Sequence, residues 1–320
     1  MVYLSVKKIK GKEYTYLMKS VRLPGGKVIT LQKLVGSNKK GLKALTAENK
    51  AFFAEKEKQA LSSFALNKFK HDDVFSIEQI KKIEGMKVEY NELLKSFSRE
   101  QFRDVFDRFT ANFTYESNAI EGSSLTLKDV GIVMFENRSL EGKDLREIYE
   151  TRNSREVVEK ILRKRFKITE NDIIKMHKML MKNIDSRVGY KQFPNEILGS
   201  PVKLTQPEKV RAEMKELIEW QEKGKENIHP LQLAALFHGK FEKIHPFSDG
   251  NGRVGRFIAI TMIVNNKYPP LIIRKTQRYS YIKALEDFHR GYTKNLERFF
   301  LEKYKKSFNK FFASYTKYIK

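Results

Sequence analysis

The chain has 320 residues, of which 40% are hydrophobic, enough for one large domain or two smaller ones. It contains no cysteine, which excludes disulfide bonds, thiolate nucleophiles and cysteine-ligated metals. The formal net charge is +24, yet the basic residues alternate with glutamates along the chain. A solvated lysine-rich surface therefore explains most of the excess, and a nucleic-acid partner is only weakly supported.

No apolar run is long enough to span a bilayer, and the start of the chain lacks the apolar core of a signal peptide. We therefore expect a cytoplasmic protein with no membrane partner.

Residues 1–36 alternate between apolar and polar side chains in three segments, "YLSVKKI", "EYTYLMKSVRL" and "KVITLQKLV". Gly11-Lys12 and Pro24-Gly25-Gly26 separate these segments as turns. The pattern predicts a small β-meander. Three strands this short rarely fold alone, so we expect the unit to pack on the rest of the chain or on a partner.

From about Gly41 the apolar residues recur at helical spacing, and we predict a mainly α protein. Residues 41–104 form a predicted helical region. Thr126 and Thr169 are each placed to cap a helix start. Residues 189–210 are broken by prolines and a glycine with β-prone pieces between them, which predicts a hairpin. Residues 291–320 are predicted to form one basic amphipathic helix.

The segment "HPFSDGNGRVGR", residues 245–256, lies between two predicted interior helices. Gly250, Asn251 and Gly252 immediately precede the second helix, where free backbone N–H groups and the positive helix end form a binding site for an anion. Arg253 and Arg256 add charge and forked hydrogen-bond donors on the first turn. The phosphate chain of a nucleotide fits such a site.

Two other residues of the segment supply chemistry beside this anion site. Asp249 offers a hard oxygen ligand suited to a Mg²⁺ ion that also binds phosphates. His245 has an ordinary pKa of about 6.5, which suits it to accept a proton from an attacking hydroxyl. A lone Gly-Asn-Gly is more often a turn than a site, but the complete set predicts transfer from a nucleoside triphosphate to a hydroxyl.

The segment resembles the signature of Fic proteins, His-x-Phe-x-Asp/Glu-Gly-Asn-Gly-Arg-x-x-Arg, and matches it at every defined position. "LTLKDV", "GKDLREIYETRN" and "LFHGKFEKIHPF" resemble the helical core of that family, and "GYKQFPNEILGS" resembles its substrate flap. "YIKAL" at 281–285 resembles its tyrosine helix. The resemblance covers about residues 105–290 and predicts a Fic-fold helical core with a short β-hairpin flap.

What the resemblance implies is transfer of AMP from ATP to a hydroxyl side chain of a target protein, with release of pyrophosphate. Gly252 stands where the phosphotransferase branch of the family has lysine, so AMP transfer is favoured. The flap, about residues 193–204, would hold a target segment by strand addition. The resemblance implies that His245 is the general base and that Asp249 holds Mg²⁺. Gly250, Asn251 and Gly252 would surround the phosphates, and Arg253 and Arg256 would bind their β/γ end. Phe247 would anchor the loop, and Tyr281 would lie beside the adenine or the target, although packing is an equal alternative for Tyr281.

Upstream, "SNAIEG" at residues 117–122 resembles the inhibitory motif of the family, Ser/Thr-x-x-x-Glu-Gly/Asn. Ser117 and Glu121 are four residues apart and share one helix face, and Gly122 is suited to end that helix. The resemblance implies that Glu121 pairs with Arg256 and blocks the productive position of the γ-phosphate.

Two alternative functions stay open. Glu121 could instead orient a water that removes AMP from a modified protein. The chain could be a nucleic-acid-binding regulator whose Fic core senses nucleotide, although no helix-turn-helix is recognisable. The target is expected to carry a Ser, Thr or Tyr hydroxyl, and both self-modification and a homodimer remain open.

Overall fold

The computed structural model describes residues 2–23, 26–36, 41–136, 140–196 and 202–316. A three-stranded antiparallel sheet opens the chain, in the order β1, β2, β3. Its strands are β1 (Val2–Ile9), β2 (Lys12–Arg22) and β3 (Val28–Leu34). The predicted β-meander is therefore confirmed.

After the sheet, all regular elements of the described chain are helices. They are α1 (Leu42–Glu48), α2 (Lys50–Lys68), α3 (Ile77–Ser96), α4 (Arg99–Ile120), α5 (Leu127–Gly131), α6 (Leu145–Leu162), α7 (Glu170–Leu180), α8 (Pro207–Gly224), α9 (Pro230–Ile244), α10 (Asn251–Asn265), α11 (Arg278–His289), α12 (Thr293–Ser307) and α13 (Ala313–Thr316). Short π-helical or 3-10 turns, η1 (Ile132–Glu136), η2 (Lys275–Gln277) and η3 (Phe308–Phe312), join some of them.

The helix starts follow their capping residues. Thr126 accepts a hydrogen bond from the Asp129 N–H in a full capping box, and Thr169 accepts one from the Asp172 N–H. Pro207 and Pro230 occupy first-turn positions, where the missing N–H of proline costs no helix hydrogen bond. The C-terminal segment is a helix interrupted by η3 rather than one continuous helix.

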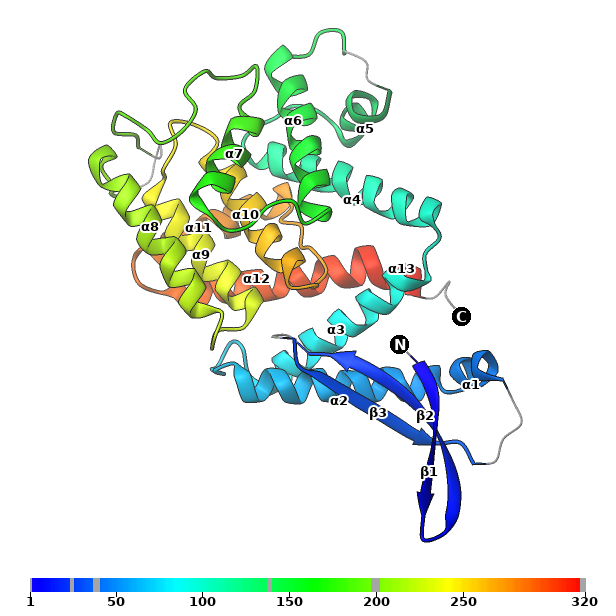
Figure 1. Cartoon of the computed structure of the whole chain (residues 1–320). Helices are drawn as coiled ribbons and strands as arrows, with labels where there is room; N and C mark the ends of the chain where they lie inside the picture. The colour runs from blue at the N-terminus through cyan, green and yellow to red at the C-terminus, as the bar shows by residue number, and fades with distance from the viewer. Residues whose placement is uncertain (1, 24–25, 37–40, 137–139, 197–201, 317–320) are drawn as a thin grey trace.

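Helix α10 lies at the centre of the molecule (Figure 1). All but two of its fifteen residues are buried, and it packs on α9, α6, α7 and α4. Because helices surround it on all sides, it carries apolar residues on nearly every face after Arg256. Its N-terminus is therefore held in a fixed position by the core.

The predicted hairpin over 189–210 is wrong for the described part of that segment. Residues 189–196 and 202–206 are irregular, and α8 begins at Pro207. Residues 197–201 of the predicted flap lie outside the described residues. Pro194 and Pro207 each remove a backbone donor that a strand ladder needs, which favours an irregular chain here.

The sheet and α1–α3 lie at one end of the molecule, while α5, α6 and α7 lie at the other (Figure 1). One sheet face packs on α2 and α3 through Val21, Leu61 and Val88. None of the described helices is long and apolar enough to cross a membrane.

Candidate active site

The loop between α9 and α10 has two left-handed backbone positions. His245 ends α9 with φ 49°, and Gly250 precedes α10 with φ 78°. A left-handed conformation is uncommon for a residue other than glycine and is kept only where the surroundings impose it. The loop is therefore specified in detail by its neighbours.

The Asn251 side chain closes this loop on itself. Its Oδ1 accepts from the Phe247 N–H at 2.9 Å, and its Nδ2 donates to the Phe247 carbonyl at 2.8 Å. Asn195 donates to the same carbonyl at 2.9 Å. Asn251 is only 2% exposed, so its side chain holds the loop instead of cradling phosphates as predicted. Its backbone still forms the first turn of α10.

Phe247 is fully buried and stacks on the His177 ring, with centroids 3.9 Å apart and planes at 4°. His177 Nε2 lies 3.1 Å from the Asp249 carbonyl, which fits a hydrogen bond that the imidazole donates. Burial lowers the pKa of His177 to about 4, so the ring is neutral. The structure thus places Phe247 as an anchor of the loop, and His177 supports the loop from α7.

The His245 imidazole lines a cleft beside the start of α10, and its Nδ1 is held by a backbone carbonyl. Its Nδ1 lies 3.3 Å from the Glu242 carbonyl and its side chain is 18% exposed. Burial lowers its pKa to about 4, so the ring is neutral near pH 7. If Nδ1 carries the proton and donates to that carbonyl, Nε2 is the basic nitrogen, and no described residue occupies it.

A cleft of about 490 Å³ opens beside the start of α10. No side chain caps this helix, so the N–H groups of its first turn are free to bind an anion. The cleft is lined by two groups of residues: Glu121, Gly122, Ser123, Asp144, Arg146, Glu147 and Glu150 from α4 to α6, and Asn195, Glu196, His245, Ser248, Asp249, Gly250, Asn251, Gly252 and Arg253 from the flap, the loop and α10.

Arg253 lies in the wall of this cleft and is 2% exposed. Its Nη1 is within ion-pair distance of a Glu150 oxygen, at 3.1 Å, but neither Nη1 nor Nε makes a hydrogen bond to the described residues. Leaving a buried donor unpaired costs free energy, so a ligand that accepts from it is favoured. The oxygens of a polyphosphate have this property.

Asp249 and Arg146 meet at the mouth of the cleft. The Arg146 Nη2 donates to Asp249 Oδ2, and Arg146 Nε contacts Glu150 at 3.1 Å. Burial acts to raise the pKa of Asp249, but the charges of Arg253 and Arg146 and the Gly250 N–H together lower it. Asp249 is therefore an ionised carboxylate that lines the cleft.

Glu121 reaches into this cleft from the end of α4. Its Oε1 accepts from Arg256 Nη2 at 2.8 Å. A Cβ atom on Gly252 would overlap the Glu121 carboxylate, so this close approach requires glycine at position 252. Gly122 follows with φ 105° and ends the helix, as predicted. The carboxylate thus lies directly over the first turn of α10, where an anion would bind.

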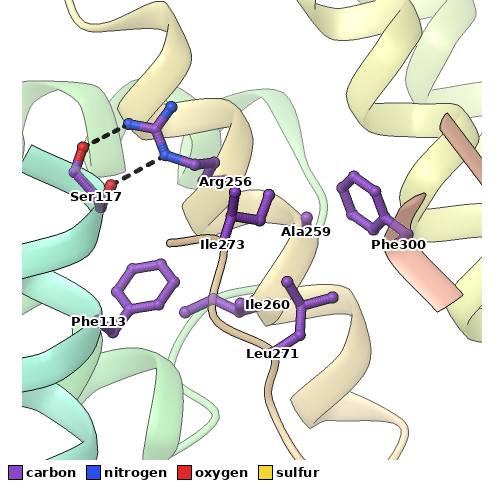
Figure 2. Close-up of a pocket in the computed structure, with 8 residues that line it drawn as sticks. All are labelled: Phe113, Ser117, Arg256, Ala259, Ile260, Leu271, Ile273 and Phe300. Carbon is purple, nitrogen blue, oxygen red and sulfur yellow. Dashed lines mark hydrogen bonds between the residues drawn. The ribbon is translucent and has the colours of Figure 1, made fainter. Parts of the chain in front are cut away.

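Ser117 completes the contact between α4 and α10. Arg256 donates from Nε to Ser117 Oγ at 3.1 Å and from Nη2 to the Ser117 carbonyl at 2.9 Å (Figure 2). Arg256 is 3% exposed, and although burial acts to lower its pKa, the Glu121 charge raises it. Ser117, Glu121 and Arg256 are therefore brought together, as the sequence motif predicts.

Helix α4 is also held from the C-terminal side. Arg274 Nη1 contacts Glu116 Oε1 at 3.2 Å, and the Lys275 N–H donates to Glu116 Oε2 at 2.7 Å. Arg278 donates to the Ile120 carbonyl at 2.8 Å. These contacts hold the last part of α4, just before Glu121.

Tyr281 does not line the cleft. It is 1% exposed, and its hydroxyl lies 2.7 Å from His238 Nε2. The predicted contact with a nucleotide or target is therefore not supported, and its packing role is what the structure shows.

Sequence reasoning missed Arg146, Glu150, His177 and Glu242 as residues around the site. Arg146 and Glu150 lie four residues apart on α6 within "GKDLREIYETRN", which resembled the family core without being assigned a role. Burial raises the pKa of Glu242 to about 8, and its Oε2 lies 3.8 Å from His245 Nδ1. Only the fold brings these residues together, because they come from α6, α7 and α9.

The fold and this site define a helical domain with a cleft at the uncapped start of a buried helix. Residues 167–263 match the model of the Fic/DOC family. The chain is 29% identical over 209 residues to the protein adenylyltransferase Fic of Nematostella vectensis, covering 64% of this chain and 49% of the relative. A relative of the same name from Drosophila mojavensis is 30% identical over 58% of this chain and 38% of its own length.

Solved structures show the same fold. A Fic-domain-containing signaling protein from Bacteroides thetaiotaomicron has a TM-score of 0.67 at 22% identity, covering 74% of this chain and 98% of the other. Fic-1 from C. elegans has a TM-score of 0.63 at 22% identity, covering 74% and 71%. Over residues 167–263 the chain therefore matches the Fic/DOC family, and its helices have the fold of these solved Fic-domain structures, as its sequence motif indicates. It spans about half or less of the length of these two curated relatives.

Proposed function

We propose that this chain transfers AMP from ATP to a hydroxyl side chain of a target protein. The observation that carries the proposal is the uncapped start of α10 beside His245, in a cleft whose wall includes a buried arginine with an unpaired nitrogen. Relatives at 29–30% identity bear the name protein adenylyltransferase, which supports the same reaction. Targets carry an accessible Ser, Thr or Tyr hydroxyl, and the chain itself is one candidate.

The residues have defined roles in this proposal. The target hydroxyl oxygen attacks the α-phosphorus of ATP, the bond from that phosphorus to the bridging oxygen breaks, and pyrophosphate leaves. His245 accepts the hydroxyl proton at Nε2, since its lowered pKa keeps the ring neutral. The N–H groups of α10 and Arg253 stabilise the charge that develops on the phosphates.

The residues present also fit Mg²⁺. Asp249 is an ionised carboxylate on the cleft, while the described residues contain no cluster of three or more His, Asp or Glu that could hold a metal alone. Mg²⁺ commonly takes one or two carboxylates and completes its shell with phosphates and water. Asp249 would hold the ion, which would neutralise phosphate charge, and Arg146 would have to move aside from this carboxylate.

In the same proposal Glu121 restrains the reaction. Its carboxylate occupies the start of α10 and engages Arg256, which the terminal phosphates of ATP would otherwise contact. A carboxylate at a helix C-terminus is mildly unfavourable by itself, and Arg256 offsets this cost. Transfer therefore requires Glu121 to leave Arg256.

The reaction is tested by asking which phosphorus of ATP reaches the protein. The Glu121→Gly variant is incubated with Mg²⁺, its own cell lysate and ATP labelled at either the α or the γ phosphorus. We expect protein labelling from the α position alone, and none with Glu121→Gly/His245→Ala. Labelling from the γ position would show phosphate transfer and contradict the proposal, as would labelling that persists without His245.

Removal of AMP is a second candidate, because the Glu121 carboxylate lines the same cleft and could orient a water. The wild-type chain is incubated with an AMP-modified protein and Mg²⁺ in the absence of ATP. Release of AMP that is lost in Glu121→Gln would favour removal as the reaction. Retention of the adduct would leave AMP transfer as the activity.

A further inference from the structure

The two faces of the N-terminal sheet have different environments. Leu17, Lys19 and Val21 of β2 face the helices. Leu17 and Val21 belong to two small apolar clusters, and Lys19 pairs with Glu57 at 2.7 Å. The opposite face carries Tyr14 and Tyr16 together with the residues in register with them, and we call it the open face. None of its side chains belongs to an apolar cluster of the described residues.

The open face is basic and carries no carboxylate. Residues 1–36 contain eight basic residues and one acidic residue, Glu13. Glu13 alternates with Tyr14 along β2 and so lies on the other face. Lys7, Lys12 and Arg22 lie on the open face, and none of them is paired with a carboxylate of the described residues. A surface with this charge distribution attracts a polyanion.

Aromatic rings lie between these cations. Tyr14 and Tyr16 are two residues apart on β2, which separates them by about 7 Å. Ser5 is opposite Tyr16 and Tyr3 is opposite Met18, so Tyr3 is the diagonal neighbour of Tyr16. The three rings therefore lie in a row on one face of β1 and β2.

Lys7 lies beside these rings. It lies opposite Tyr14, its Nζ is 5.0 Å from the centre of the Tyr16 ring, and it donates to Gln32 at 2.7 Å. Cation and aromatic side chains thus share one surface without being buried in a core. Figure 1 shows the hairpin of β1 and β2 extending away from the helices, so a long ligand has access to it.

We propose that the open face binds single-stranded nucleic acid. Bases stack on Tyr3, Tyr14 and Tyr16, and Lys7, Lys12 and Arg22 contact phosphates. Stacking on aromatic rings beside a basic groove is how many proteins hold single strands without strict sequence preference. A second copy of this chain is a poor occupant of this face, because two basic surfaces would repel each other. The proposal is independent of the reaction at the α10 cleft.

The test is fluorescence anisotropy with three labelled ligands. These are a twelve-nucleotide oligomer of uridine, one of thymidine, and a duplex of mixed sequence and the same length. We expect the full-length protein to bind the single strands more tightly than the duplex, with affinity falling steeply as salt rises. Lys7→Glu/Lys12→Glu should weaken binding by tenfold or more, roughly the effect of losing two phosphate contacts. Tyr14→Ala should weaken it by about fivefold, the loss of one stacked base.

Matched controls use the same chemical changes elsewhere. Lys209→Glu/Lys223→Glu reverses two exposed charges on α8, and Tyr292→Ala removes a ring that is 67% exposed before α12. Both should bind like the wild type. Thermal unfolding checks that each sheet variant folds. If a variant does not fold, the decrease of wild-type binding affinity with rising salt still tests the proposal.

Several outcomes would overturn the proposal. These are equal or tighter binding of the duplex, unchanged binding in both folded sheet variants, equal loss in the α8 control, or no binding by the wild type at 50 mM salt. The His245→Ala variant should bind as the wild type does, so failure of AMP transfer and failure of nucleic-acid binding are distinguishable. A difference between uridine and thymidine oligomers would assign RNA or DNA as the preferred strand.

Discussion

The start of α10 and the open face of the sheet organise polar side chains in opposite ways. The arginines of α10 and Asn251 are buried, and most charged and polar groups around this helix are tied to a partner, as Arg256 is to Ser117 and Glu121. On the open face the lysines and tyrosines are exposed or half-buried, and few contact one another. A single change should therefore abolish the chemistry of the first region, while changes in the second should act gradually.

The largest expected effect comes from His245→Ala in the Glu121→Gly background. Loss of the general base should lower the rate of AMP transfer by about 10²–10⁴-fold. The rate is measured as label from the α-phosphorus per unit time, and Tyr292→Ala serves as the control. A decrease of less than tenfold would mean that the proton leaves by another route.

The Asn251 side chain tests whether the loop is held as tightly as its contacts indicate. Asn251→Ala removes two hydrogen bonds to Phe247 in a buried site and should lower the free energy of unfolding by about 1–3 kcal/mol. Asn266→Ala is the matched control, because its side chain makes one bond to the Met262 carbonyl at the other end of α10. Denaturant unfolding compares the two. Equal losses would show that the loop is not specially dependent on Asn251.

The His245 and Asn251 predictions also show how much of the site could be predicted from the sequence alone. The spacing of residues 245–256 predicted the base, the helix start and the arginines, because each role depends on residue type and position in one segment. It could not show that Asn251 turns inward, since the Phe247 backbone competes with a ligand for its amide. Arg146 and His177 were missed because their partner, Asp249, is distant in the sequence.

The flap and the sheet differ in how well their β-structure could be predicted from the sequence. β-prone residues between 189 and 210 suggested a hairpin, but no strand forms in the described part of that segment. In residues 2–34 the period-two alternation is sustained over three segments with turns between them, and the predicted strands form. Sustained alternation with matched turns predicted strands correctly, whereas short β-prone pieces between prolines did not form strands. The predicted boundaries at 1–36, 41–104, 105–290 and 291–320 stay predictions.

A smaller effect is expected where α4 is held from outside the cleft. Arg274→Ala removes the ion pair with Glu116, one residue before Ser117, and should raise AMP transfer by about two- to fivefold, since the pair is partly exposed. Arg290→Ala removes exposed surface contacts at 4.0 Å and is the control. In a Glu121→Gln background Arg274→Ala should add nothing, because both changes act on the same restraint. An additive increase would contradict this coupling.

A pH dependence of stability is also expected, and it is set by Glu242. Burial raises its pKa from about 4.5 unfolded to about 8 folded, so the folded state holds a proton that the unfolded state releases. The free energy of unfolding should therefore fall as pH rises from about 5 to 8. Glu242→Gln should remove this contribution, seen as a flatter Tm between pH 5 and pH 8. Parallel Tm profiles for the two proteins would contradict the assignment.

The central claim is that Glu121, by holding Arg256, restrains the transfer of AMP. The most direct measurement compares single-turnover rates of AMP transfer at saturating ATP in the wild type, Glu121→Gln and Glu196→Gln. Both carboxylates line the cleft, but only Glu121 contacts Arg256. The account predicts an increase of about tenfold or more for Glu121→Gln and none for Glu196→Gln. Equal rates in all three proteins, or equal increases in the two variants, would contradict it.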